Sequence, residues 1–396
     1  MTTDRLRCYR CGASGDRSSR SRCPCGEPRW FDTDGGYDPA DPPDDHGVWR
    51  YRDLLPVDEP QGLAVAAGGT PLVRTAGLDA FAGCRTWVKD EAEHPTGSFK
   101  DRGSAVGVAD ALERGVSTVG TVSHGNMAMS VAAHAAAVDL DCVVLVPADI
   151  PSERLAIIDR YDPTILRIDG DYGRLYAESL RIGDSLDIAF LNSDVPTRVA
   201  GQKTTMLELL DAWRPSAPDA VVMPVSSGGH ASGAWKAIRD LRDGGALPGT
   251  PKLCFVQAAA CAPVATAFEA DAETVTPVEP GETIAYSIAN ADPPSGTRAL
   301  AAAQATDGAV VSVDDDEIRA ARRRFARDAG FAVETASATT LAGARRLAAD
   351  GVVGPDDRIV LVATGSGLKE SAEASAPDPA AVALDELAGT LATRFE

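Results

Sequence analysis

One lysine, Lys100, lies in a string whose residue types suit covalent chemistry at an amine. The string is His-Pro-Thr-Gly-Ser-Phe-Lys-Asp-Arg-Gly (residues 94–103), and small residues that favour a helix follow it. Pro95 and Gly97 break regular structure, and Ser98 can cap the following helix. We therefore expect Lys100 at the start of that helix among apolar neighbours. Desolvation there lowers the pKa of a lysine and makes its amine nucleophilic, as formation of a Schiff base requires.

Four of the eight cysteines form two close pairs, each followed by a glycine. The pairs read Cys-x-x-Cys and Cys-x-Cys, which is the spacing of a structural zinc ribbon with its second pair shortened. A disulfide framework is the alternative, and a cytoplasmic location disfavours it. Four thiolates would leave no open position on the metal, so its role would be structural. The candidate ligands are Cys8, Cys11, Cys23 and Cys25.

Three further strings place glycines and hydroxyl residues directly after apolar, β-branched runs. They are Ser-His-Gly-Asn (123–126), Ser-Ser-Gly-Gly-His-Ala-Ser-Gly (226–233) and Thr-Gly-Ser-Gly-Leu-Lys (364–369). Successive N–H groups in such a turn bind an anion without a basic side chain. Ligands of open parallel sheets bind at the carboxyl ends of the strands, so we expect these strings to share one site.

From residue 47 onward, β-branched runs alternate with small-residue stretches, which predicts an α/β fold with mostly parallel strands. We expect a catalytic region over 47–375. A zinc-ribbon-like element (1–32) and an acidic linker (33–46) precede it, and an acidic tail (376–396) follows. The expected strands are 86–89, 118–122, 142–146, 165–168, 220–225, 252–256 and 358–362.

Taken together, the strings resemble the threonine synthase family of pyridoxal-phosphate (PLP) enzymes. Residues 94–103 are similar to the family's lysine loop, Asn-Pro-Thr-Gly-Ser-Phe-Lys-Asp-Arg-Gly, with His94 in place of asparagine. Residues 334–338, Glu-Thr-Ala-Ser-Ala, follow the family's Glu-Pro-Ala-Ser-Ala pattern. The resemblance covers residues 5–372. It implies a fold-type II, tryptophan synthase β-like enzyme with two open-sheet subdomains.

The resemblance also implies how the cofactor is held. Lys100 would carry PLP, Asn126 would hydrogen-bond its phenolic oxygen, and Thr364 would meet its ring nitrogen. His230 either donates to the cofactor phosphate or is a solvent-exposed residue at a helix start. The residues implied around the phosphate are Ser226, Ser227, Gly228, Gly229 and His230.

Residues 192–204, Asn-Ser-Asp-Val-Pro-Thr-Arg-Val-Ala-Gly-Gln-Lys-Thr, resemble the family's substrate segment. Arg198 suits a phosphate because a guanidinium offers paired donors. The implied substrate contacts are Ser123, Asn192, Ser193, Arg198 and Lys203. The departures from the family pattern are expected to gather where substrates bind, and they are His94, Met127, Val195, Ser227 and His230.

The reaction that the resemblance implies is that of a threonine synthase, in which O-phospho-L-homoserine and water give L-threonine and phosphate. Arg198 favours this reaction. The changes at Met127, Ser227 and His230 favour an alternative, a PLP-dependent threonine or serine ammonia-lyase or a β-replacement synthase. A non-catalytic PLP-binding paralogue is a third hypothesis, against which the retained Lys100 argues.

The charge pattern is unusual, with a net charge of −20 and only six lysines among 38 basic residues. Such a surface stays soluble when salt screens it, which indicates a halophilic source, and it offers nucleic acid no basic stripe. No apolar run reaches the roughly 18 residues of a membrane span, and no secretion signal is seen. We therefore expect a cytoplasmic enzyme with a small amino-acid substrate. The family resemblance implies a homodimer.

Overall fold

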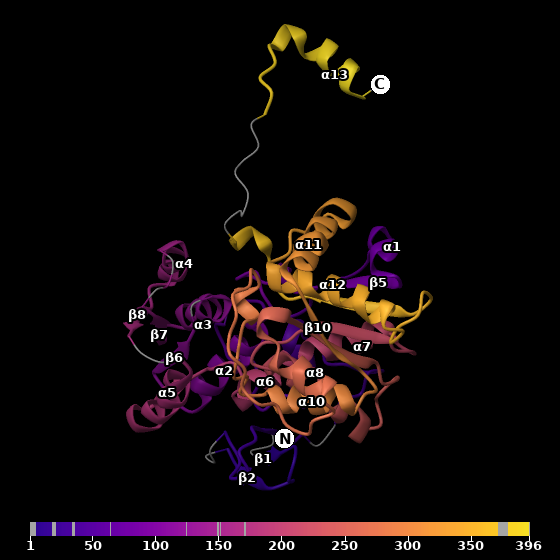
Figure 1. The fold of residues 1–396 in the computed structure, drawn as a ribbon. Helices are drawn as coiled ribbons and strands as arrows, with labels where there is room; N and C mark the ends of the chain where they lie inside the picture. The colour runs from indigo at the N-terminus through magenta and orange to yellow at the C-terminus, as the bar shows by residue number, and fades with distance from the viewer. Residues whose placement is uncertain are drawn as a thin grey trace.

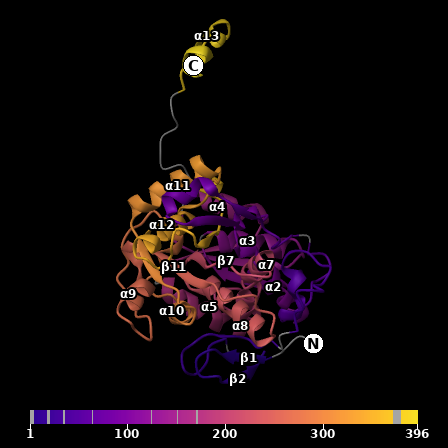
Figure 2. The ribbon, with the colours of Figure 1, turned by 90° about the vertical axis from the view of Figure 1, so that its right-hand side faces the viewer.

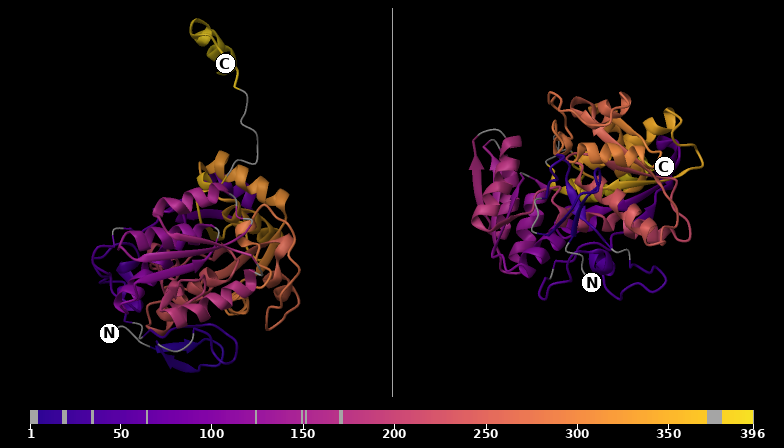
Figure 3. Two further views of the ribbon diagram at one scale, coloured as in Figure 1. Left: turned by 90° about the vertical axis from the view of Figure 1, so that its left-hand side faces the viewer. Right: turned by 90° about the horizontal axis from the view of Figure 1, so that it is seen from below.

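The computed structural model describes residues 5–17, 21–33, 36–63, 65–123, 125–148, 150, 152–169, 172–370 and 379–395. Two α/β subdomains lie side by side, and a small N-terminal β element lies beneath them (Figure 1). Seen from below, the smaller subdomain lies to one side of the larger one (Figure 3). The α/β class and the two open sheets that the sequence predicts are confirmed.

The larger subdomain is built on a six-stranded sheet in the order β12-β11-β10-β13-β5-β4, parallel except for β4. Its strands are β4 (Leu72–Arg74), β5 (Arg85–Asp90), β10 (Ala220–Pro224), β11 (Lys252–Ala258), β12 (Val310–Val313) and β13 (Arg358–Ala363).

Helices cover both faces of this sheet, so its central strands are nearly continuous aliphatic runs. Val221 and Val360 face one apolar core, whereas Val222 and Leu361 face the other. The first core includes α7 (Thr204–Trp213), α8 (Gly229–Asp243), α9 (Pro263–Glu269) and α10 (Gly296–Gln304). The second includes α1 (Asp79–Ala82), α11 (Asp315–Ala329) and α12 (Thr335–Ala349).

The smaller subdomain has a parallel four-stranded sheet in the order β8-β7-β6-β9. Its strands are β6 (Thr118–Val122), β7 (Asp141–Pro147), β8 (Thr164–Ile168) and β9 (Ile188–Phe190), and its helices are α3 (Asn126–Ala136), α4 (Ser152–Ile158) and α5 (Tyr172–Leu186).

Two helices connect the subdomains. Helix α2 (Lys100–Glu113) packs against α3 and against α6 (Pro196–Gln202), which in turn packs against α8. Gly201 permits this close approach, because a Cβ there would lie 2.0 Å from the Arg102 carbonyl oxygen. Helix α2 therefore starts at the junction between the two sheets.

The N-terminal element is an antiparallel sheet of β1 (Arg5–Cys8), β2 (Ser14–Asp16) and β3 (Arg29–Phe31). It lies beneath α8 and α10 (Figures 1 and 2). In the described part of the expected linker, Tyr37 is buried and its hydroxyl donates to Asp211, which fixes the linker to α7 at this point. Helix α13 (Leu387–Phe395), in the expected tail, is exposed and lies apart from the subdomains (Figure 1). Residues 376–378 and 396 of that tail lie outside the described residues.

All seven strands expected from the sequence are present, with ends that differ by at most two residues. The short strands β4, β9 and β12 were not predicted. In the described part of the chain, every helix is too short or too polar to cross a membrane.

Candidate active site

Lys100 is the first residue of α2, where the chain turns from the carboxyl end of β5 into that helix. Asp101 fixes the turn by accepting hydrogen bonds from the N–H (2.9 Å) and the hydroxyl (2.5 Å) of Thr96. The prediction that Ser98 caps the helix is wrong, because Phe99 occupies the N-cap position. The Ser98 hydroxyl is buried and has no partner among the described residues.

A buried ion-pair network anchors the first turn of α2. Arg102 is fully buried; its Nε donates to Glu91 Oε2 and its Nη1 to Glu208 Oε1, each at 2.6 Å. Lys89 Nζ also donates to Glu208, at 2.7 Å. Burial raises the pKa of Glu208, but the charge and hydrogen bonds of Arg102, together with the charge of Lys89, outweigh it and lower that pKa to about 2. Nothing local in the sequence indicates either glutamate.

A buried carboxylate, Glu334, joins two of the predicted cofactor residues. Its Oε1 accepts from Thr364 Oγ1 (2.9 Å), and its Oε2 accepts from Asn126 Nδ2 (2.7 Å). Lys369 Nζ donates to Asn126 Oδ1 (2.8 Å). The Phe99 N–H donates to the Thr364 carbonyl oxygen (3.0 Å), which brings this group next to the lysine loop. The predicted meeting of these loops is thus observed, whereas the contacts of Glu334 and Lys369 were not foreseen.

The turn into α8 is a cup that only glycine can form. Gly228 has a φ of 85°, and a Cβ on it would lie 2.4 Å from the Ser295 carbonyl oxygen. A Cβ on Gly229 would lie 2.3 Å from the Ser193 carbonyl oxygen. The first N–H groups of a helix have no partner within it. The cup therefore offers backbone donors to an anion.

His230 lies behind the cup. It is buried, so the solvent-exposed alternative is wrong. Its ring stacks on Phe99 with centroids 4.0 Å apart, and its Nε2 lies 3.0 Å from Thr205 Oγ1. Burial lowers the pKa of His230 to about 3, so its imidazole is neutral at neutral pH when no ligand is bound.

Lys100 has the nucleophilic character that the sequence predicts. Burial and, to a smaller extent, the charge of Arg198 lower its pKa, Glu334 opposes both, and the resulting pKa is about 7. Arg198 is fully buried and donates from Nη2 to the Lys100 carbonyl oxygen (3.2 Å) and from Nη1 to Ser104 Oγ (2.9 Å). Its Nε has no partner among the described residues.

Two of the expected substrate contacts are used elsewhere. Asn192 Oδ1 accepts from the Val122 N–H (3.0 Å), and its Nδ2 donates to Ser179 Oγ (2.9 Å). Lys203 is buried, and its Nζ donates to Asp240 Oδ2 (2.7 Å). These side chains join neighbouring elements and, unlike Arg198, are not among the buried side chains with an unpartnered atom in the described residues, so we leave both out of the proposed substrate site.

Five residues that depart from the family pattern were expected to gather where substrates bind. For two of them, His94 and Met127, this expectation is wrong. His94 is buried, with Nδ1 2.9 Å from the Glu91 carbonyl oxygen and with Nε2 accepting from the Gly68 N–H (3.0 Å). Met127 packs in the apolar core of the smaller subdomain. Neither change therefore argues for a different substrate.

A pocket lies between the subdomains beside this group of residues. Arg154 of α4 reaches across it, with its guanidinium carbon 3.7 Å from the centre of the Tyr286 ring. The pocket is lined by residues of both subdomains, among them Asn126, Arg154, Tyr286, Glu334 and Lys369.

Comparison with known proteins identifies the family. Residues 63–365 match the family described as pyridoxal-phosphate dependent enzyme. The threonine synthase of Methanocaldococcus jannaschii is 37% identical over 86% of this chain and 83% of its own length. The chain belongs to the threonine synthase family of PLP-dependent enzymes. The threonine synthase of Mycobacterium tuberculosis is 36% identical over 82% of this chain and 88% of its own length.

Solved structures of other PLP enzymes share the fold. Maize serine racemase aligns with a TM-score of 0.63 at 20% identity, over 82% of this chain and 92% of its own. A bacterial threonine deaminase, from T.th., aligns with a TM-score of 0.63 at 26% identity, over 78% of this chain and 94% of its own. The fold-type II architecture is therefore confirmed.

The residues present fit PLP. The glycine cup suits a phosphate, the Asn126 amide suits the phenolic oxygen, and Lys100 offers an amine to the aldehyde. Ser98 Oγ and His230 Nδ1 are buried without partners among the described residues. Such orphaned atoms are expected where a polar ligand completes the site.

The lowered pKa of Lys100 leads to a prediction for the apoenzyme. Capture of added PLP should accelerate as the pH rises through about 7, because the neutral amine attacks and its fraction is set by that pKa. An unperturbed lysine, with a pKa of about 10.4, would give a midpoint about three units higher. Stopped-flow absorbance measures the rate, with N-acetyl-lysine as the reference amine. A midpoint that coincides with that of N-acetyl-lysine would contradict the prediction.

Proposed function

We propose that this protein is a threonine synthase that converts O-phospho-L-homoserine and water to L-threonine and phosphate. The similarity to threonine synthases over most of the chain carries the proposal. The Halalkalibacterium halodurans threonine synthase, 33% identical over 81% of this chain and 90% of its own length, adds to it. The buried guanidinium of Arg198 beside Lys100 supports it further, because it suits a substrate with a second anionic group.

Lys100 is the proposed proton carrier. When bound there, PLP supplies an electron sink that makes protons beside the amino group easier to remove. Lys100, displaced by the substrate amine, takes protons from Cα and Cβ and returns protons to Cγ and Cα as a general acid–base. The Cγ–O bond breaks and phosphate leaves. Water gives its hydroxyl to Cβ, and its remaining proton leaves with the phosphate, so the atoms balance.

The other residues position the cofactor and substrate. Thr364 offers the ring nitrogen a hydroxyl. Unlike a carboxylate, a hydroxyl does not keep that nitrogen protonated. Asn126 is proposed at the phenolic oxygen, and the turn that begins at Ser123 at the substrate carboxylate. Ser193 and Arg198 are proposed at the leaving phosphate.

An ammonia-lyase is the alternative, and the threonine deaminase from T.th. shares the fold. That reaction needs the same cofactor residues but no second phosphate site. One assay separates the two: O-phospho-L-homoserine and threonine are supplied separately in high salt, and phosphate and 2-oxobutyrate are measured. The proposal predicts phosphate and threonine from the first substrate. Formation of 2-oxobutyrate from threonine, without turnover of O-phospho-L-homoserine, would refute it.

Arg198→Ala tests the phosphate site in the same assay. Phosphate release should fall about 10²- to 10³-fold, the usual cost of losing a donor to developing charge. Because Arg198 also donates to the Lys100 carbonyl oxygen, the visible absorption of bound PLP is recorded to show that the cofactor remains. Arg319→Ala is the control, since that arginine pairs with Asp316 on the surface. Equal rates in the two variants would remove Arg198 from the proposed site.

We also propose that the enzyme works as a cytoplasmic homodimer in amino-acid biosynthesis and that it is adapted to high salt. The homodimer rests on the family resemblance. The adaptation rests on the net charge of −20, since salt screens the repulsion among the 58 acidic side chains.

A further inference from the structure

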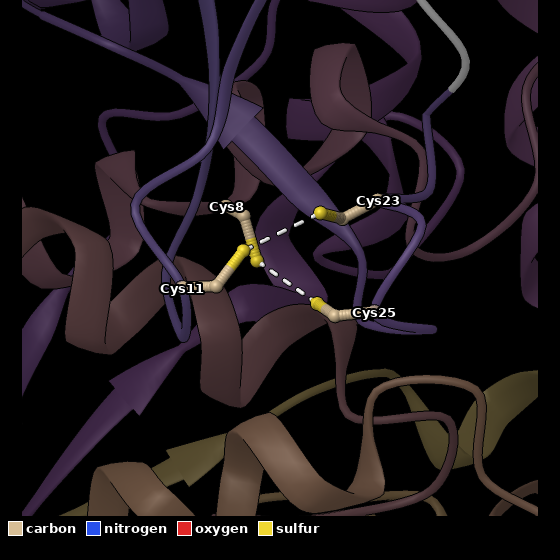
Figure 4. Close-up of side chains that lie close together, drawn as sticks. All are labelled: Cys8, Cys11, Cys23 and Cys25. Atoms are coloured by element: carbon tan, nitrogen blue, oxygen red, sulfur yellow. Dashed lines mark hydrogen bonds between the residues drawn. The ribbon is translucent and has the colours of Figure 1, made fainter.

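The sulfur atoms of four cysteines in the N-terminal β element lie close together (Figure 4). We call this element, described over residues 5–17 and 21–33, the ribbon. Sγ of Cys8 lies 3.6 Å from Sγ of Cys25, Sγ of Cys11 lies 3.5 Å from Sγ of Cys23, and all four lie within 4.8 Å of one another. Thiolates about 2.3 Å from a tetrahedral zinc would be about 3.8 Å apart, so the donor set fits Zn²⁺.

Arg22 connects this cysteine cluster to the catalytic region. It directly precedes Cys23, and its Nη1 donates to the Gly26 carbonyl oxygen (2.8 Å), so the second cysteine turn holds the guanidinium. Its Nη2 donates to Asp194 Oδ2 (3.1 Å) and to the Pro294 carbonyl oxygen (2.7 Å). The side chain of Asp194 is only 5% exposed, so this ion pair is shielded on the acceptor side.

Asp194 lies in the loop between β9 and α6, next to Ser193 of the proposed substrate site. Its carboxylate also accepts from Ser295 Oγ (3.1 Å) and from the Tyr176 hydroxyl. Tyr176 belongs to α5 of the smaller subdomain, and Ser295 directly precedes α10 of the larger one. One carboxylate therefore joins the ribbon to both subdomains.

The loop that holds Ser193 and the segment before α10 that holds Ser295 both border the glycine cup. The Ser295 N–H donates to the Ser227 carbonyl oxygen (2.9 Å). The carbonyl oxygens of Ser193 and Ser295 are the atoms that leave no room for a Cβ on Gly229 and Gly228. A displacement of Asp194 would therefore shift two neighbours of the cup.

The ribbon does not depend on Arg22 for its docking. Trp30 of the ribbon packs edge-on against Trp235 of α8, with ring centroids 5.7 Å apart. Arg298 of α10 is fully buried and donates to Ser232 Oγ (2.8 Å) and to the Arg29 carbonyl oxygen (3.4 Å). The link through Arg22 can therefore be removed while the ribbon stays in place.

We propose that the ribbon cysteines bind one Zn²⁺ and that the metal-bound cysteine turn holds Arg22 on Asp194, which keeps the substrate loop seated against the cofactor cup. Arg22 is thus a positioning residue that acts through Asp194. The proposal rests on the proposed function for the identity of the substrate and on the fold for everything else.

The first experiment measures zinc and kinetics in the full-length protein. Elemental analysis of wild-type protein purified without chelator should give one zinc per chain. Arg22→Gln should keep its zinc and its melting temperature, while kcat/KM for O-phospho-L-homoserine falls about tenfold through a misplaced loop. Arg22→Lys, which keeps the charge, should recover part of the loss. Arg7→Gln is the matched control, because Arg7 directly precedes Cys8 and its ion pair with Asp32 lies within the ribbon.

The second experiment tests whether metal and arginine act through one path. Cys25→Ser should lose zinc and show a similar loss of kcat/KM, and Arg22→Gln combined with it should cost no more than Cys25→Ser alone. Independent, multiplying losses would overturn the coupling, as would wild-type kinetics in Arg22→Gln. Protein without zinc would overturn the metal site. If the wild type turns over threonine and not O-phospho-L-homoserine, the proposed function fails, and the same comparisons are made with threonine.

Discussion

Replacing Lys100 by alanine is expected to abolish turnover, with a loss of at least about 10⁴-fold. The reason is that one amine both attaches the cofactor and moves the protons at Cα, Cβ and Cγ in the proposed reaction. The purified variant should also lack the visible absorption of covalently held PLP that borohydride removes from the wild type. Spectra and phosphate release from O-phospho-L-homoserine measure the two effects separately.

Lys252→Ala is the control for this experiment. Lys252 lies at the start of β11, away from the cofactor residues, and its Nζ donates to the Val352 carbonyl oxygen (2.9 Å). It should keep both the absorption and the activity. Retention of both by Lys100→Ala would refute the assignment of the cofactor lysine, and loss of both in the control would show that the assay reports on folding.

The largest effect on stability is expected for Arg102→Met. This change removes the cation between Glu91 and Glu208, so the buried Glu91 loses its arginine partner and Glu208 keeps Lys89 alone. Breaking a buried pair in this way costs about 3–5 kcal/mol of the free energy of unfolding. Denaturant unfolding at neutral pH measures the loss.

Arg85→Met is the matched control for Arg102→Met. Arg85 pairs with Asp356 at 2.7 Å, but these side chains are 53% and 86% exposed. Solvent screens such a pair, so its loss should change the free energy of unfolding by at most about 1 kcal/mol. Equal destabilisation by the two substitutions would contradict the role given to the buried network.

The sequence predicts the central strands of this fold because a strand that is buried on both faces is a continuous run of apolar residues. β10 and β13 are covered on both faces and read as uninterrupted aliphatic runs. β4 is a partly exposed edge strand of three residues, and β9 also has only three residues. Segments this short carry too few residues for a periodic pattern to stand out.

The site also contains residues that the sequence identifies and contacts that it does not. Lys100, Asn126, the glycine cup and Thr364 lie in short strings. The order of residues indicates an anion site for the cup, whereas the roles of Asn126 and Thr364 come from the family resemblance. Contacts between distant residues leave no such pattern in the sequence, and Arg22 and Asp194 are separated by 172 positions. The strings also do not show that the polar side chains of His230 and Lys203 are buried. Motif order therefore identifies which loops meet, and the structure shows which side chains face inward.

The proposed threonine synthase reaction is tested most directly by following the oxygen atom of water into the products. Wild-type enzyme is incubated with O-phospho-L-homoserine in water enriched in heavy oxygen, and mass spectrometry follows both products. A lyase that breaks the Cγ–O bond and hydrates Cβ will put the label in the hydroxyl of threonine and none in the phosphate. Labelled phosphate with homoserine as the other product would mean simple phosphoester hydrolysis and would contradict the account.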